Sequence, residues 1–231
     1  VSGYKKNSLN LAAELYSIIV NKVIKSPSIK IAETSKLLEN IYRSVNISLI
    51  NELKIACDNL GVDLYKVIDI SSTKPFGFQK FTPGPGAGGH CIPVDPYYMI
   101  QRAADVGVPA GLITAARAVN RSMPSHVAGV IGDLMWNAGV PAGEAKVLLL
   151  GWSYKAEVGD PRETPAEPLA ETLISKGIKV GAWDPHLNAN DFPDDIDVVT
   201  DLLQANGYDM VVLVTAHKAC LSIDWESLNK Q

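Results

Sequence analysis

The sequence predicts an α/β protein in which an all-helical part precedes a domain built on a parallel β-sheet. Apolar side chains recur at helical spacing over much of residues 1–140. After Pro141, short aliphatic runs alternate with one helical segment, as in a strand–helix–strand unit. This change of pattern places a domain boundary near Pro141.

The composition is that of an ordinary globular protein, with 231 residues, 47% hydrophobic and 20% charged content, and a net charge of -4. Charges of one sign never gather into a block of about five or six, so we expect no nucleic-acid partner. The three cysteines include no CxxC pair, which argues against a disulfide framework and a structural zinc site and indicates a cytoplasmic setting. No apolar run approaches the roughly 18 residues of a membrane span, so no membrane partner is expected.

In the helical part, an amphipathic helix is expected over about residues 10–23. The partly apolar segment 22–31 could include an edge strand. A long helix follows over residues 33–60, because apolar side chains form one stripe and a glycine then ends it. Ten of the 22 residues in the segment 75–96 are Gly or Pro, so we expect a loop there.

Helical patterning resumes at residues 97–104 and 113–138. Pro124 is expected to interrupt the second of these helices and to open a new one, because proline lacks the N–H that a helix interior uses.

The C-terminal part predicts strands at 146–151, 178–184 and 208–215, with a helix at 165–176. Thr164 and Glu167 are expected to form a capping box whose helix presents free amides to an anion.

Cys91 is the candidate nucleophile of the Gly/Pro-rich loop. Glycines let a substrate approach backbone amides closely, and a thiol among them is open to attack. Burial for packing is the alternative for any cysteine, but the preceding Gly-Gly pair and the following Asp95 favour chemistry. Cys57 and Cys220 lack such surroundings and are assigned to packing. His90 is not assigned as a base, because adjacent residues rarely turn toward each other.

Two further sets of polar residues are candidates for ligand contacts. Lys36 and Asn40 share one face of the long helix and could meet one ligand oxygen, although solvated surface is the alternative. Lys155 and Arg162 follow a predicted strand and could reach phosphates, with a solvated loop as the alternative. The bulky Trp152 follows Gly151, so a glycine fingerprint for a dinucleotide is absent from this turn.

Four segments together resemble the nucleotide-sugar 6-dehydrogenase family, also called UDP-glucose/GDP-mannose dehydrogenases: residues 33–40, 84–95, 120–124 and 155–164. Their order and spacing agree with the family. The resemblance implies three parts: residues 1–32 as a remnant of the end of the N-terminal dinucleotide-binding domain, 33–140 as a central helical dimerisation domain with the catalytic loop, and 141–231 as a Rossmann-like nucleotide-sugar-binding domain. The N-terminal NAD domain is expected to be absent and the chain alone to be inactive.

By this resemblance the parent protein oxidises the sixth-carbon alcohol of a nucleotide sugar to a carboxylate in two NAD-dependent steps. A homodimer through the central helices is expected, because the helices from Glu33 and Ile113 present more apolar surface than a small domain can cover alone. Cys91 is then the nucleophile, Lys36 and Asn40 stabilise the oxyanion, and Asp95 positions or activates the hydrolytic water. Arg162 would reach the NAD pyrophosphate, and no metal is expected. The UDP-sugar would contact Lys80, Phe81, Thr82, Pro83, Gly84, Gly88 and Lys155.

Val94 stands where the UDP-glucose branch of the family commonly carries Lys. Together with residues 73–78, it is similar to the branch that acts on UDP-N-acetylhexosamines, and Lys74 is then expected as the cation that other members supply from the partner subunit. Two alternatives stay open: UDP-glucose or GDP-mannose as substrate, and a non-catalytic dimerising module that binds nucleotide sugars without a cofactor domain.

Overall fold

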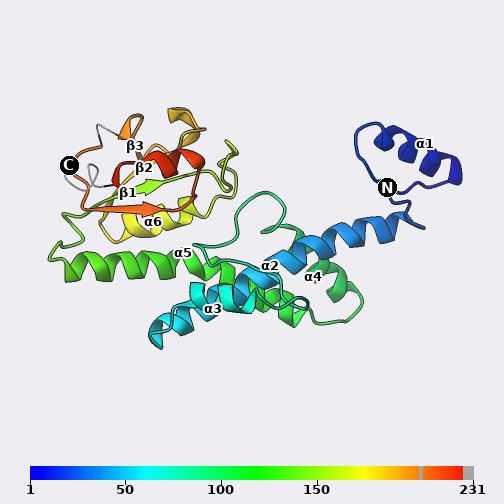
Figure 1. The fold of residues 1–231 in the computed structure, drawn as a ribbon, viewed down its shortest axis with the longest axis horizontal. Helices are drawn as coiled ribbons and strands as arrows, with labels where there is room; N and C mark the ends of the chain where they lie inside the picture. Colours follow the sequence, from blue (N-terminus) through cyan, green and yellow to red (C-terminus); the bar gives the residue numbers. More distant parts are fainter. Residues whose placement is uncertain (203–204, 226–231) are drawn as a thin grey trace.

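The computed structural model describes residues 1–202 and 205–225, which form a helical half followed by a sheet half (Figure 1). The helical half contains α1 (Lys6–Ser17), α2 (Ile29–Asn59), α3 (Leu64–Ser71), α4 (Asp95–Asp105) and α5 (Gly111–Asn137). The sheet half contains β1 (Lys146–Leu150), α6 (Ala166–Ser175), β2 (Lys179–Trp183), β3 (Asp197–Val198), β4 (Met210–Leu213) and the short 3-10 helices Ala189–Asp191 and Lys218–Ser222. The predicted fold class is confirmed; residues 226–231 of the predicted C-terminal domain lie outside the described residues.

Within the described residues, four parallel strands lie in the order β3-β2-β1-β4. The expected strand–helix–strand unit is β1–α6–β2, and α6 lies between the sheet and α5 (Figure 1). The two-residue strand β3 was not predicted, because so short a segment cannot show the alternation of apolar and polar side chains that is typical of a strand. Parallel strands end at one edge, so the segments after β1, β2 and β4 meet there.

The helix α5 belongs to both halves. Its beginning contacts α2 and α4, whereas Ala128, Ile131 and Met135 near its end are buried in the core under the sheet. The predicted interruption at Pro124 is wrong, because α5 runs unbroken through this buried proline. The carbonyl of Asn120, which residue 124 would bond in a regular helix, lies 3.1 Å from the position that a Cβ on Gly86 would occupy.

The expected capping box at the start of α6 is also absent. The helix begins at Ala166, whose N–H donates to the Thr164 hydroxyl at 3.2 Å, and that hydroxyl donates in turn to the Trp152 carbonyl at 2.6 Å. Glu167 is exposed and forms no reciprocal bond to the Thr164 backbone N–H, which donates to the Pro161 carbonyl. Thr164 therefore ties the start of α6 to the end of β1.

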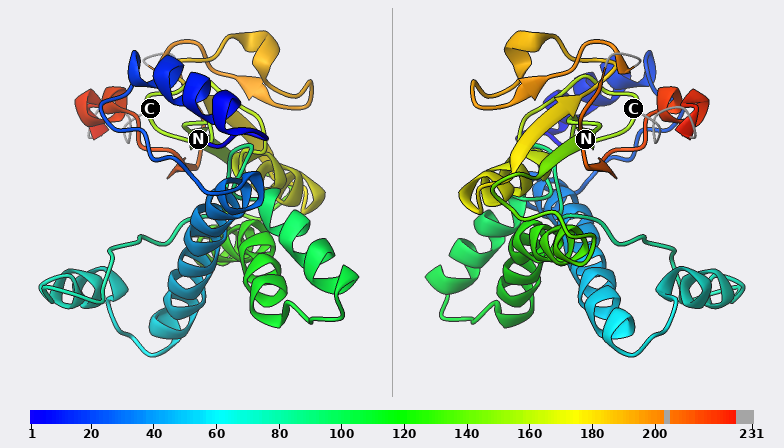
Figure 2. Two further views of the ribbon diagram at one scale, coloured as in Figure 1. Left: turned by 90° about the vertical axis from the view of Figure 1, so that its right-hand side faces the viewer. Right: turned by 90° about the vertical axis from the view of Figure 1, so that its left-hand side faces the viewer.

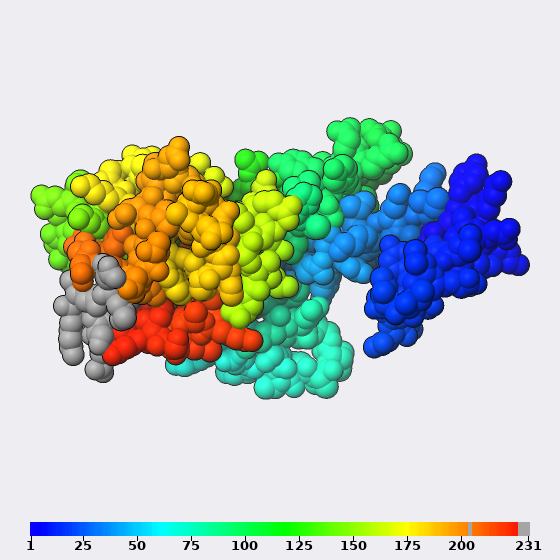
Figure 3. Space-filling view, turned by 90° about the horizontal axis from the view of Figure 1, so that it is seen from above, coloured from blue at the N-terminus to red at the C-terminus, as the bar shows by residue number. Residues whose placement is uncertain are grey.

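Residues 1–28 form a separate lobe at one end of the molecule (Figure 3). The first helix ends at Ser17, earlier than its apolar stripe predicted, and the expected edge strand at 22–31 is wrong. Backbone bonds do join Val1 to Ile24 and Ser26, but no strand forms. The helix α2 begins at Ile29 because the Ser28 hydroxyl accepts the Ile31 N–H.

The helix α3 was not expected, although its Asp63 cap is visible in the sequence: the carboxylate accepts the N–H groups of Tyr65 and Lys66. Together with the loop that follows, α3 projects sideways from α2 (Figure 2). Within the described residues, no helix combines the length and apolar character needed to cross a bilayer.

Candidate active site

The long helix α2 brings together three polar side chains on one stripe. Asn40 is fully buried, and its Oδ1 accepts hydrogen bonds from Lys36 Nζ at 3.5 Å and from Arg43 Nη2. Its Nδ2 donates to Asp95 Oδ2, although 55 residues of chain separate the two. The structure therefore joins three of the four predicted catalytic residues in one cluster.

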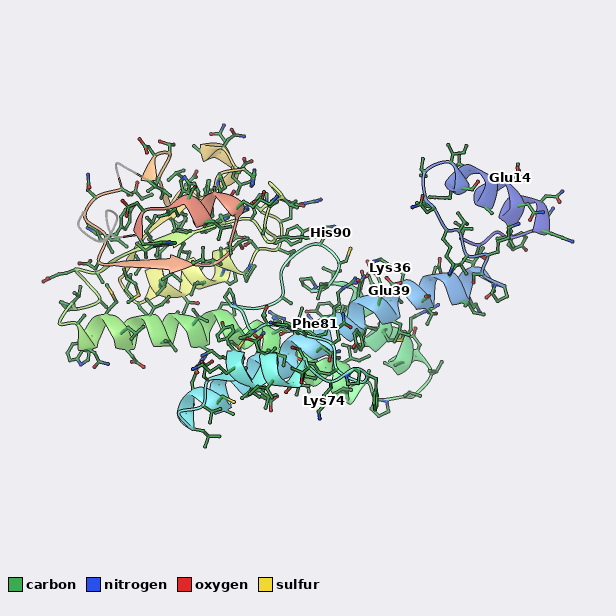
Figure 4. The ribbon with its side chains drawn as sticks, viewed as in Figure 1. Glu14, Lys36, Glu39, Lys74, Phe81 and His90 are labelled. Atoms are coloured by element: carbon green, nitrogen blue, oxygen red, sulfur yellow. The ribbon has the colours of Figure 1, made fainter. Side chains whose placement is uncertain are left out.

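The fourth, Cys91, lies one turn before α4. Its carbonyl accepts the N–H groups of Val94 and of Asp95, at 3.2 and 2.8 Å, so the backbone links the cysteine to the Asn40–Asp95 contact. The thiol is free and its residue exposed. Figure 4 shows the neighbouring His90 on the loop beside the part of α2 that carries Lys36 and Glu39. The cysteine is thus exposed, and its backbone is bonded to Asp95, whose carboxylate meets Asn40.

The loop that carries Cys91 is anchored at Gly84 to a chain of buried amides. The Gly84 N–H donates to Asn51 Oδ1 at 2.9 Å, Asn51 Nδ2 donates to Asn120 Oδ1 at 3.1 Å, and Asn120 Nδ2 donates to the Ser44 carbonyl at 3.0 Å. These contacts tie the loop to both α2 and α5. They explain how a segment without regular structure keeps a fixed position.

The glycines before Cys91 allow the loop to approach the sheet half. A Cβ on Gly88 would lie 2.7 Å from Pro165 Cδ, and one on Gly89 would lie 2.6 Å from the Tyr154 ring. Gly89 also has a φ of 91° and donates its N–H to the Glu163 carbonyl at 3.2 Å. The absence of side chains at Gly88 and Gly89 therefore leaves space for Pro165 and Tyr154. From the sequence, this space was expected to admit substrate.

The predicted substrate contacts divide between two places. Phe81 packs edge-on against Tyr42 beside the small core of α2 and α3, and Lys80 pairs with Asp69 of α3 at 2.6 Å. Lys74 is exposed on the projecting segment, and Figure 4 shows it apart from Lys36 and His90. Within one chain, Lys74 and Lys80 therefore do not join the Cys91 cluster.

Lys155 lies exposed on the loop after β1, which a buried carboxylate holds in place. Asp184, at the end of β2, accepts the N–H groups of Trp152 and Ser153 and that of His186, and it faces His217 Nε2 at 3.1 Å. The other ring nitrogen of His217 accepts the Glu157 N–H at 3.0 Å, so Nε2 carries the hydrogen and donates. The residues that precede and follow Lys155 in the chain are thus held at the edge of the sheet where the strands end.

Arg162 lies on the same loop, 67% exposed, and pairs with Asp160 at 2.6 Å. The Arg162 side chain, its backbone N–H and its charge lower the pKa of Asp160 to about 2. The guanidinium is accessible to an anion while its own carboxylate partner stays ionised.

The sequence predicted no metal site. Among the described residues, Glu157, His186 and His217 place candidate ligand atoms within 4.8 Å of one another. Both ring nitrogens of the buried His217 already form the protein hydrogen bonds described above, so the cluster offers no free lone pair from that ring. The geometry fits the tethering of a loop and does not fit a coordinating set.

A cavity of about 560 Å3 lies between the Cys91 loop, α4, α5 and the start of α6. Arg117 stacks 3.1 Å from the centre of the Tyr97 ring, and Arg121 donates to its hydroxyl at 3.3 Å. Hydrogen bonding to Arg117 is the main cause of a lowered pKa for Tyr97. Sequence reasoning missed these arginines and Arg43; for Arg43, the spacing 36, 40, 43 on one helix face was an available signal.

Two family models match this chain. Residues 30–122 match the central domain of the UDP-glucose/GDP-mannose dehydrogenase family, and residues 148–231 match the UDP binding domain of the same family. The chain is 34% identical over 230 residues to the UDP-N-acetyl-D-mannosamine dehydrogenase of Pyrococcus horikoshii, a match that covers 100% of this chain and 52% of that protein. It is 33% identical over 231 residues to the UDP-N-acetyl-D-glucosamine 6-dehydrogenase of Pseudomonas aeruginosa, a match that covers 99% of this chain and 54% of that protein.

Among solved structures, the UDP-D-ManNAc dehydrogenase of Pyrococcus horikoshii superposes with a TM-score of 0.86 at 32% identity, covering 99% of this chain and 52% of that one. The chain spans about half the length of the curated relatives it matches.

Proposed function

Because the chain belongs to the UDP-glucose/GDP-mannose dehydrogenase family, whose members are NAD-dependent nucleotide-sugar dehydrogenases, we propose that the complete protein oxidises the sixth-carbon alcohol of a UDP-sugar to a carboxylate. One observation supports this most directly. The Asn40–Asp95 contact joins two of the four motifs that carry the resemblance at a point one turn from Cys91.

Cys91 acts as the nucleophile of this reaction. Its thiolate sulfur forms a bond to the carbon of the intermediate aldehyde, and the carbonyl electron pair moves to oxygen, which gives a thiohemiacetal. Loss of hydride from that carbon restores the C=O bond as a thioester. Water then adds and loses a proton to Asp95, the C–S bond breaks with its electron pair on sulfur, and the thiolate is regenerated as the product is released as a carboxylate and a proton. The exposed position of Cys91 supports this role, since a substrate can reach the sulfur.

The side chains around Cys91 support the charge changes. The N–H of Asn40 that has no partner among the described residues, and the ammonium of Lys36, whose side chain is 58% exposed, stabilise the oxyanion that forms on addition. Asp95 holds the attacking water and takes its proton. Its contact with Asn40 keeps the two groups on one side of the reacting carbon.

The cofactor NAD accepts hydride in each oxidation when it is bound. The turn after β1 does not fit its pyrophosphate: a Cβ on Gly151 would lie 2.1 Å from the Thr215 carbonyl oxygen, and Trp152 is buried against Phe192. That glycine therefore serves packing against the segment after β4. In the described part of the chain, Arg162 is the residue we assign to contact with the cofactor.

The substrate we propose is a UDP-N-acetylhexosamine. The relatives from Pyrococcus horikoshii and Pseudomonas aeruginosa bear names for this substrate class, and Val94 and the segment 73–78 support the same choice. The backbone of residues 80–84 and of Gly88 would hold the sugar, with Lys155 at the nucleotide. A pocket with an apolar wall and sufficient space suits an N-acetyl group. Contacts of this kind change the ratio of kcat/KM between competing substrates by roughly 10- to 200-fold.

A homodimer through the helical half completes the proposal. The projecting α3 and the loop after it expose large apolar side chains, among them Ile70 at 71% and Phe76 at 85%. A second copy of the chain would cover them. Lys74 lies between these two residues, so the same contact would carry it to the partner's site.

The test of the proposed function is the Cys91→Ser variant of the complete protein, with Cys57→Ser as the matched control. We expect two NAD molecules reduced per UDP-sugar in the unmodified protein. Cys91→Ser should lower kcat by several orders of magnitude and leave nucleotide-sugar affinity nearly unchanged, because serine is the weaker nucleophile. Retention of more than roughly a tenth of the rate would rule out covalent catalysis at Cys91. Binding of UDP-sugars without any turnover would indicate a non-catalytic module.

A further inference from the structure

The buried amide of Asn40 has all but one of its hydrogen-bonding positions filled. A primary amide offers two acceptor positions on oxygen and two N–H donors. Lys36 and Arg43 fill the acceptor positions, and one N–H donates to Asp95. The second N–H has no partner among the described residues. In the proposed function, this N–H is the donor assigned to the oxyanion.

The orientation of this amide decides whether a donor faces the reacting atoms. If the side chain turned by 180° about its last bond, its NH2 group would meet the guanidinium of Arg43 and its oxygen would meet the carboxylate of Asp95. Donor would then face donor and acceptor would face acceptor, with no water present because the side chain is fully buried. Arg43 and Asp95 therefore select one orientation.

Lys36 alone is a poor means of holding the amide oxygen. Its ammonium lies at 3.5 Å from Oδ1, its side chain is 58% exposed, and it also reaches Glu39 at 3.9 Å. Arg43 is half-buried one helical turn further along, and it forms no ion pair within the described ranges. Its guanidinium keeps Oδ1 bonded when Lys36 moves to a substrate.

We propose that Arg43 is a positioning residue that holds the Asn40 amide with its nitrogen toward Asp95 and the reacting carbon. The proposal rests on the proposed function, which gives Asn40 the task of donating to the oxyanion. Arg43 acts through Asn40 and leaves Lys36 free for the substrate. Its removal should therefore affect the chemical steps more than the binding of the UDP-sugar.

The first experiment compares Arg43→Met, Arg43→Lys and Arg102→Met in the complete protein, with NAD and a UDP-N-acetylhexosamine. Arg102 is a matched control, since it is an exposed arginine paired with Asp105 on α4. We expect Arg43→Met to lower kcat about 10- to 100-fold, less than the roughly 100- to 1,000-fold typical of losing an oxyanion donor outright, with KM changed by less than about twofold. Arg43→Lys should recover part of the rate, and Arg102→Met should be unchanged.

The second experiment places Arg43→Met in an Asn40→Ala background. If Arg43 acts through Asn40, the double variant should be slower than Asn40→Ala by less than about threefold. If the fold loss in kcat of the double variant equalled the product of the losses of Arg43→Met and Asn40→Ala, the proposal would be overturned. A rise in the KM of Arg43→Met with unchanged kcat would overturn it as well. An Asn40→Ala variant with wild-type kcat would instead refute the oxyanion role within the proposed function. Should Arg43→Met fail to fold, Arg43→Lys and Arg43→Gln provide the same cycle.

Discussion

The two halves of the molecule bury different kinds of side chain. The sheet half has a continuous apolar core, in which Leu149, Leu169 and Leu173 are completely buried. The helical half instead buries the amides of Asn40, Asn51 and Asn120, and its own apolar cluster holds only three buried residues in the described chain. Apolar contacts stabilise without direction, whereas buried amides fix position at a cost in stability. The difference indicates that stability comes chiefly from the sheet half and the geometry of the site from the helical half.

The largest expected effect is on stability, from Leu169→Ala. Truncation of this buried leucine removes apolar contacts and leaves a cavity, so we expect the free energy of unfolding to fall by about 2 to 5 kcal/mol. The matched change Leu53→Ala on α2, at 41% exposure, should cost less than about 1 kcal/mol. Chemical denaturation followed by tryptophan fluorescence, to which the buried Trp152 contributes, measures both. Equal losses would contradict the comparison.

An intermediate effect is expected from Ile70→Asp, which tests whether the helical half depends on a second copy. A charge on the exposed face of α3 should raise the dimer dissociation constant by roughly 10- to 150-fold, the equivalent of about 1.5 to 3 kcal/mol for one buried apolar side chain. The control is Leu221→Asp on the sheet half, where a side chain of 87% exposure should not affect association. Sedimentation velocity measures both; an unmodified protein that stays monomeric at tens of micromolar would refute the dimer.

The smallest effect is expected from Arg162→Gln, at a surface ion pair of the sheet half. Because the folded-state pKa of Asp160 is about 2, below its usual 3.8, the pair stabilises the fold above pH about 3.8, and this contribution is lost as pH falls through about 2. Exposure of the pair keeps the contribution small at neutral pH. We expect the Asp160 pKa, measured by NMR titration, to rise in the variant. A value still near 2 would assign the shift to the Arg162 backbone N–H instead.

The elements that sequence predicted well are those whose pattern is long. The stripe on α2 and the β1–α6–β2 unit repeat a spacing over several turns or strands, the Gly/Pro loop is marked by its composition over 22 residues, and the structure has each of them. Helix α3 and strand β3 are short, so their few residues carried little periodicity. Pro124 was predicted to interrupt a helix, as proline usually does, but the packing of α5 against α2 and α6 overrides this local preference.

Within the candidate site, spacing predicted Lys36 and Asn40 as one face and placed Asp95 near Cys91. It could not show that Asn40 and Asp95 touch, since that contact depends on where a loop of irregular structure returns. Arg43 was missed for a related reason: a single arginine on a helix resembles solvated surface until its partner is seen. Contacts between segments that are distant in the sequence were therefore the part of the candidate site that the sequence could not predict.

The helix α5 has a mechanical consequence for the whole molecule. Its 27 residues make a rod about 40 Å long, embedded at one end against α2 and at the other in the core under the sheet. A tilt of about 5° at one end displaces the other by roughly 3 to 4 Å over such a length. Bending of the rod concentrates at Pro124, where the helical ladder lacks one bond. The carbonyl left free at that point is the one against Gly86, so flexing between the halves would reach the Cys91 loop directly.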